Sequence, residues 1–193
     1  MEKFKLVRPT IEYKEQALEY MKEHYEYNSA IHGVGGLDRH LNNYEEWLDK
    51  LEDDRNRKAN EERDPAETFF FVRVNDNKVI GMINIRLALN EKLRKSGGHI
   101  GYSIRPTERR KGYNKINLYL ALLECQKHGL KKVMLSCNKD NLGSAKTIQS
   151  FDAELEREFY DDEVYHCIEQ AYWIDVDSAI KNKKNEFEKY IAK

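Results

Sequence analysis

The sequence predicts an α/β protein with a mixed, mostly antiparallel sheet of about six or seven strands and helices on both faces. A chain of 193 residues is long enough for one domain with a full hydrophobic core. Apolar residues alternate in several short segments and recur at helical spacing in others, and two pairs of alternating segments are separated only by polar turns. The resulting element order, β-α-α-β-β-β-α-β-α-β-β, is typical of a sheet covered on both sides.

The first third of the chain predicts one strand, two helices and a loop between them. Residues 4–8 alternate as a strand, and apolar residues recur at helical spacing over 11–21. The clustered glycines of 28–38 break regular structure and predict a turned loop. A second helix follows over 41–51, and the charged run 52–64 is expected to be its solvated end.

The remainder predicts a three-stranded meander, a helix, and a second hairpin that encloses a short helix. The expected strands and helices, in chain order, are strand 68–74, strand 79–87, strand 99–105, a helix from Asn114 or Lys115 to Gly129, strand 132–137, helix 141–150, strand 154–160 and strand 164–176. Asp177 and Ser178 are expected to cap a last helix over 179–191. We therefore divide the chain into one domain over 1–177 and a helical extension over 178–193, which either docks or frays.

Composition and charge exclude several classes of function. The chain has 33 basic and 34 acidic residues and a net charge of -1, so no global field draws it to nucleic acid or to an anionic membrane. No segment approaches the ~20 apolar residues that span a bilayer. Cys125, Cys137 and Cys167 form no Cys-x-x-Cys pair, which favours free thiols and a cytoplasmic location. His24, His32 and His40 lack the spacing of metal ligands, and we expect no metal.

The most informative segment is GHIGYSIRPTERRKGYN over 98–114, which predicts a strand, a basic turn and a helix N-terminus. Unpaired amides and the helix dipole favour an anion at such a point, and the arginines and lysine of the turn add full charges. An anionic cofactor is therefore expected there.

This arrangement resembles the GNAT superfamily of acetyl-CoA-dependent N-acetyltransferases over most of the chain. In that family an Arg/Gln-x-x-Gly-x-Gly/Ala turn holds the pyrophosphate of acetyl-CoA, and Arg109 and Gly112 fill its first and fourth places. Asn114 stands where Gly or Ala is usual. The cofactor-binding residues expected from strand end to helix start are Ile104, Arg105, Arg109, Arg110, Lys111, Gly112, Tyr113, Asn114 and Lys115.

A second motif of the family is an Asn after the next strand, which faces the pantetheine arm, with a small residue three places on. Asn141 and Ser144 match it. Many members place a Tyr seven residues after that Asn to protonate the departing thiolate, but this chain has Ile148, and Ser150-Phe-Asp-Ala153 replaces the glycine that usually closes the short helix. Both departures concern catalysis more than cofactor binding.

Acetylation of an amine requires loss of a proton from the ammonium and protonation of the leaving thiolate. We expect His99 as the base, because it lies on the central strand, and the amide of Ile104 as the donor to the thioester carbonyl. Tyr102, Tyr160 and Tyr165 are the candidate acids. The resemblance implies direct attack in a ternary complex, and an acyl-Cys137 intermediate is the alternative route.

The resulting hypothesis is an N-acetyltransferase that acts on a small amine-bearing molecule or a peptide amine, as a monomer or homodimer. Glu23, Glu26, Asp38 and the loop over 32–38 could attract a cationic acceptor, or the acids could be ordinary solvated surface. The alternative hypothesis is a catalytically impaired GNAT-fold module that binds acyl-CoA or a partner without turnover.

Overall fold

The seven strands that the structure describes form two antiparallel sheets that meet at one point. A computed structural model describes residues 1–58, 64–162 and 166–192. The first sheet has the order β1 (Phe4–Val7), β2 (Ala66–Arg73), β3 (Lys78–Arg86) and β4 (Ile100–Ile104). The second has the order β5 (Lys132–Asn138), β7 (Cys167–Asp175) and β6 (Glu154–Asp161). The predicted α/β class and the two hairpins are confirmed, and the predicted single sheet is divided in two.

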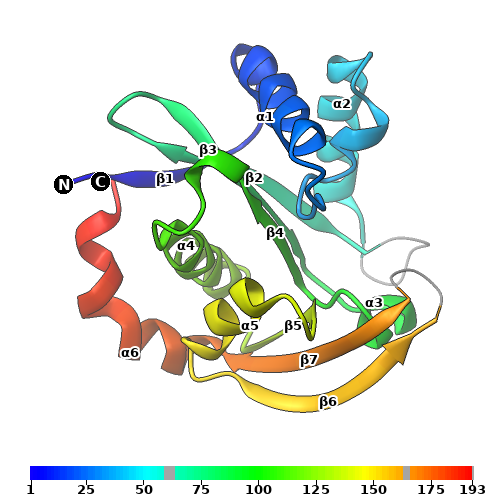
Figure 1. Ribbon diagram of the computed structural model, residues 1–193, viewed down its shortest axis with the longest axis vertical. Coiled ribbons are helices and arrows are strands. Elements are labelled where there is room, and N and C mark those ends of the chain that lie inside the picture. Colours follow the sequence, from blue (N-terminus) through cyan, green and yellow to red (C-terminus); the bar gives the residue numbers. More distant parts are fainter. Residues whose placement is uncertain (59–63, 163–165, 193) are drawn as a thin grey trace.

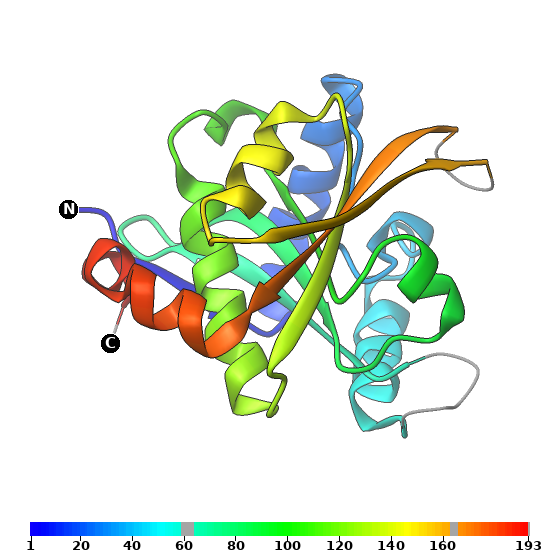
Figure 2. The same ribbon diagram turned by 90° about the horizontal axis from the view of Figure 1, so that it is seen from below.

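Helices cover both faces of the first sheet (Figure 1). Two helices, α1 (Lys14–Glu26) and α2 (Tyr44–Asn56), cover one face, and α4 (Tyr113–Lys127) covers the other. Two more helices, α5 (Leu142–Gln149) and α6 (Val176–Phe187), pack beside α4. Strands β6 and β7 extend from this side of the molecule as a long curved hairpin (Figure 2).

Strand β2 separates the two cores by simple alternation of its side chains. Phe69 and Phe71 belong to the core under α4, whereas Phe70 and Val72 belong to the core under α1 and α2. All four are at most 5% exposed. Because successive side chains of a strand point to opposite faces, a run of apolar residues is what a strand covered on both sides requires.

The two sheets touch through the residues that precede β4. Gly98 forms an isolated bridge with Leu135, and the His99 amide donates to the Met134 carbonyl at 2.7 Å. Beyond this point β4 and β5 share no ladder. The last four residues of β4 therefore have an open edge, and this opening positions the functional site.

The C-terminal helix docks onto the core rather than fraying. Phe187 is 4% exposed, and its ring lies 5.4 Å from that of Tyr119 and 5.7 Å from that of Phe151, centroid to centroid. The helix begins earlier than predicted, because the side chain of Asp175, not Asp177, accepts the Ser178 amide at 2.9 Å. A further short helix, α3 (Glu91–Lys95), was not predicted, since its five mostly charged residues show no apolar period.

Candidate active site

A cleft of about 480 Å³ opens where β4 and β5 part. Its size is within the range of small-molecule sites. The residues of its wall, together called the cleft lining, are Ala30, His32, Gly33, Arg86, Gly97, Ile100, Gly101, Tyr102, Ser136, Cys137, Asn138, Asp140, Asn141, Ser144, Cys167 and Glu169.

The cleft has two sides, because side chains alternate along β4. Tyr102 packs toward the core of α4 and α5, whereas a side chain at Gly101 would point at Gly33 and Arg86, on the face of α1. Glycine is required at position 33, because its φ is +73° and an added Cβ would lie 2.3 Å from the Gly101 carbonyl oxygen. The loop after α1 thus lies directly on β4 at the cleft.

The first of the two sides carries Tyr102 and Ser144 in direct contact. The Tyr102 hydroxyl lies 2.8 Å from Ser144 Oγ, and the Asn141 side chain accepts the Ser144 amide at 3.1 Å. Burial raises the pKa of Tyr102 well above its usual value, so the phenol is protonated at neutral pH. Ile148, at the usual place of the family's acid, is fully buried in the core.

The structure separates the three candidate acids. Tyr102 lines the cleft, whereas Tyr160 is 60% exposed on β6 and does not line it. Tyr165 falls outside the described residues. Cys137 also lines the cleft, but burial raises the pKa of its thiol to about 11, so it is not a thiolate at neutral pH.

The amides of Tyr102 and Ile104 point toward the open edge of β4. The Arg105 amide donates to Ile80 of β3 at 2.8 Å, and amides of an antiparallel strand alternate in direction. The Ile104 amide therefore points away from β3, as an oxyanion donor would have to. Its carbonyl, on the same edge, accepts from Arg109 Nε at 3.0 Å.

The basic turn before α4 has the backbone of an anion site. Arg110 and Gly112 have φ of +62° and +79°, and no side chain caps the N-terminus of α4. The side-chain nitrogen Nδ2 of Asn114 lies 3.5 Å from Thr147 Oγ1 of α5. The buried side-chain oxygen Oδ1 of Asn114 has no hydrogen-bond partner among the described residues. Of the turn's cations, Arg110 is exposed and pairs with no described carboxylate.

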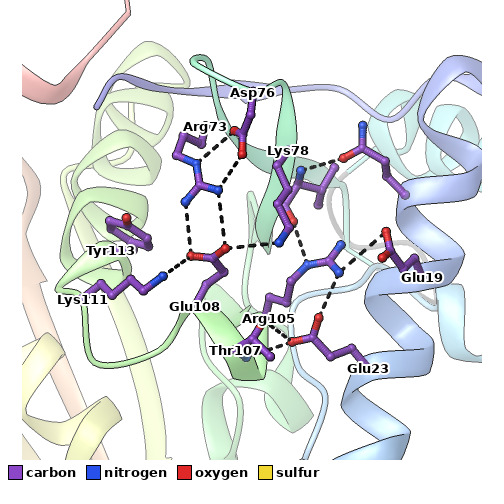
Figure 3. A network of polar contacts seen from close by, with 12 residues as sticks. Glu19, Glu23, Arg73, Asp76, Lys78, Arg105, Thr107, Glu108, Lys111 and Tyr113 are labelled. Atoms are coloured by element: carbon purple, nitrogen blue, oxygen red, sulfur yellow. Dashed lines mark hydrogen bonds and ion pairs between the residues drawn. The ribbon is translucent and has the colours of Figure 1, made fainter. Parts of the chain in front are cut away.

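The other basic side chains of the turn are held by the protein itself. Arg109 Nη2 donates to Ser29 Oγ at 2.5 Å, and Lys111 Nζ donates to Glu108 at 2.7 Å (Figure 3). Glu108 also accepts from Arg73 and Lys78, both at 3.2 Å. Although burial opposes it, these three cations lower the pKa of Glu108 to about 2. Lys111 is thus a partner of Glu108 before any ligand is bound.

Two residues expected to bind cofactor direct their side chains elsewhere. Arg105 is 1% exposed and donates to Glu23 at 2.9 Å and to the Val79 carbonyl at 3.1 Å (Figure 3). Its guanidinium also lies over the Tyr20 ring. This orientation follows from strand alternation, which directs the Arg105 side chain to the α1 face. The Tyr113 hydroxyl donates to Glu2 at 2.6 Å, and its ring lies under Lys111 Nζ, 5.9 Å from the ring centroid.

His99, expected as the base, joins the two sheets. Its Nδ1 accepts the Met134 amide at 2.9 Å, and it is 7% exposed and absent from the cleft lining. Burial, and then the charge of Arg86, lower its pKa to about 4, so it is neutral at pH 7.

The acidic residues at the cleft differ from those that were expected. Glu23 binds Arg105 and Thr107, Glu26 pairs with Lys22 at 3.7 Å, and Asp38 pairs with Arg39 at 3.8 Å. Sequence reasoning missed Glu169 of β7, which lines the cleft and is 4% exposed. The signal that could have found it was a carboxylate within an otherwise apolar and aromatic strand.

Comparison with known proteins identifies the family. Residues 34–152 match the acetyltransferase (GNAT) family. The chain belongs to this GNAT acetyltransferase family. No curated protein matches its sequence.

Solved structures of GNAT acetyltransferases share its fold at low sequence identity. A structure of RimJ from Mycobacterium smegmatis in complex with CoA-disulfide has a TM-score of 0.70 and 14% identity, covering 95% of this chain and 88% of that one. The microcin C7 self-immunity acetyltransferase MccE, in complex with acetyl-CoA and AMP, has a TM-score of 0.65 and 15% identity, covering 90% of this chain and 92% of that one. A mutant form of the spermidine/spermine N-acetyltransferase SpeG from Vibrio cholerae has a TM-score of 0.64 and 11% identity, covering 93% of this chain and 99% of that one.

The described residues contain neither a membrane-spanning helix nor a metal-binding cluster. Among the helices that the structure describes, none is both long and apolar enough to cross a bilayer. Within residues 1–58, 64–162 and 166–192, no group of three or more His, Cys, Asp or Glu side chains could hold a metal ion.

Proposed function

We propose that this GNAT protein transfers the acetyl group of acetyl-CoA to a primary amine by direct attack within a ternary complex. The observation that carries the proposal is the cleft itself, which leads from the α5 side of the opened sheet to the α1 side. A thioester can then reach it from one side and an amine from the other, so that both meet at the open edge of β4.

The residues on the α4 and α5 side fit acetyl-CoA. The uncapped N-terminus of α4 offers amides to the pyrophosphate, and Arg110 has a charge that no described carboxylate neutralises. When bound, acetyl-CoA supplies an acetyl thioester with a thiolate leaving group.

Tyr102 is the residue we assign as the acid. The C–N bond forms as the C–S bond breaks, and the sulfur needs a proton as it leaves. A phenol with a raised pKa retains its proton until a stronger base forms beside it, and the contact with Ser144 Oγ fixes its direction. Tyr102 passes this proton to sulfur and regains one from the acetylated nitrogen. The amide of Ile104 is the proposed donor to the carbonyl oxygen.

The relatives suggest acceptors to test, because they include enzymes named for spermidine and for the alanine of ribosomal protein S5. We therefore propose to measure CoA thiol release with spermidine, small alkylamines and a peptide with a free N-terminal alanine. Release above the rate of acetyl-CoA hydrolysis supports a transferase. If CoA raises the melting temperature but no amine yields thiol, the alternative of a non-catalytic acyl-CoA-binding module replaces the proposal.

A further inference from the structure

We infer that Glu169 is the residue that takes the proton from the acceptor ammonium. This inference rests on the proposed function, because it assigns a role on the acceptor side of the same cleft. Glu169 lies near the start of β7, the central strand of the second sheet, opposite Asn138 of β5 and Phe159 of β6. The second sheet therefore holds its backbone from both sides, as a reacting group requires.

The carboxylate is fixed at one oxygen and available at the other. Ser96 Oγ, at the end of α3, donates to Glu169 Oε2 at 3.0 Å. Glu169 Oε1 has no hydrogen-bond partner among the residues that the structure describes, and the residue lines the cleft. A carboxylate oxygen that has no donor and belongs to a residue lining a cleft favours a cationic or protonated partner, which an ammonium group would provide.

Glu169 also lies on the correct side of the opened sheet. Cross-strand partners share a face, and Ser96 approaches Glu169 from the face of α3, opposite to the face of Cys137 and α5. The cofactor side carries Tyr102 and Ser144. An amine bound at Glu169 would therefore approach the thioester from the side away from the leaving sulfur.

Among the other titratable groups at the cleft, Tyr102, Cys137 and Cys167 keep their protons at neutral pH, so His32 and Asp140 are the competitors for this role. Burial, and then Arg86, lower the pKa of His32, whereas burial raises the pKa values of Tyr102, Cys137 and Cys167. Asp140 is exposed and adjoins Asn141 on the cofactor side. The groups that face Glu169 are Ser96, Asp161, Arg86, His32 and Cys167, whereas Cys137 points to the opposite face of the sheet.

The protons balance over one turnover. The ammonium loses one proton to Glu169, which returns it to solvent, and the neutral amine attacks the thioester carbon. After the C–S bond breaks, the second proton leaves the new amide nitrogen and Tyr102 delivers one to sulfur. The products are the acetamide, CoA thiol and one released proton.

The test uses Glu169→Gln and amines of nearly equal size but falling basicity, from ethylamine through its mono-, di- and trifluorinated forms. If Glu169 is the base, the variant should lose about 10²- to 10³-fold in kcat/KM with ethylamine. It should lose less than about fivefold with trifluoroethylamine, which is already largely neutral at pH 7.5. The matched control is Glu158→Gln on β6, an exposed carboxylate bonded to Lys139, which should match the wild type with every amine.

The outcomes separate this inference from the proposed function. A wild-type protein that acetylates none of these amines, spermidine or the peptide contradicts the proposed function itself. An active wild type with an equally active Glu169→Gln variant, or a variant with the same loss for every amine, overturns only the role of Glu169. As a control, CoA should raise the melting temperatures of Glu169→Gln and Glu158→Gln as much as that of the wild type. Equal shifts show that the fold and the proposed cofactor side are intact. The role would pass to His32 if His32→Gln lost kcat/KM in proportion to amine basicity while Glu169→Gln lost none.

Discussion

The hydroxyl of Tyr102 on β4 lies 2.8 Å from Oγ of Ser144 on α5, so two segments of distant sequence meet on one side of the cleft. Ser144 belongs to the first turn of a helix that begins after Asn141, and the tyrosine comes from the strand whose edge is open. This contact provides a protonated phenol on the proposed cofactor side of a GNAT fold whose usual acid position holds the buried Ile148.

Replacing Tyr102 with Phe should lower kcat by about 10²-fold or more, because the departing thiolate loses its proton donor. The KM for acetyl-CoA should change little, since no charge is removed. Steady-state thiol release measures both constants. Tyr160→Phe, which removes an exposed hydroxyl outside the cleft, is the control and should have no effect. Equal activity of wild type and Tyr102→Phe would rule out the assignment of the acid.

The arginines Arg105 and Arg110 should respond differently to substitution. Arg110→Asn keeps a residue that tolerates positive φ but removes an exposed charge beside the proposed phosphate site, so affinity for CoA should fall about two- to fivefold, and less at high salt. Arg105→Ala should instead destabilise the fold, since it leaves Glu23 without its buried partner. Calorimetric titration and urea unfolding distinguish the two effects, and a reversed pattern would contradict our account of the turn.

Glu108 should stabilise the protein in a pH-dependent manner. Its pKa falls from 4.5 to about 2 in the folded protein, so its contribution is full above pH 4.5 and is lost as the pH falls toward 2. Allowing for solvent screening, we expect Glu108→Gln to lower the free energy of unfolding by about 1–2 kcal/mol at pH 7. Urea unfolding at a series of pH values should show this difference narrowing below pH 4.5. A difference that is independent of pH would show that charge is not the cause.

His99 should affect stability rather than the rate profile near neutral pH. Its pKa is lowered from 6.5 to about 4, so the unfolded chain binds the proton more tightly and stability falls as the pH drops from 6.5 to 4. We expect about 3 kcal/mol from this residue across that interval. His24 and His32 also have lowered pKa values, so the comparison must be with His99→Gln, whose stability should vary less with pH. A neutral-pH limb in the rate profile that His99→Gln abolishes would restore His99 as the base.

The sequence was sufficient for those parts of the fold and site that depend on local chemistry. The glycine at position 112 and the apolar period after it predict a turn and a helix, and both are present. Hairpin β2–β3 follows from its alternation and its polar turn. In contrast, α3 is too short to show a period, and the cap at Asp175 competes with an equally suitable Asp177 two residues later.

The parts that were not predictable depend on contacts between distant segments. Arg105 and Arg109 belong to one basic segment, but the strand directs Arg105 toward Glu23, 82 residues away in the sequence. The meeting of Tyr102 with Ser144, and the approach of Ser96 to Glu169, both depend on where the second sheet separates from the first. No local pattern specifies that point of separation.

The most direct test of the central claim is a crystal structure of the protein with CoA. Our account predicts the pyrophosphate at the amides that follow Gly112, with Arg110 nearby, and the sulfur within hydrogen-bonding distance of the Tyr102 hydroxyl, between β4 and β5. CoA bound elsewhere on the surface, or a sulfur atom outside the cleft with Tyr102 still bonded only to Ser144, would contradict it.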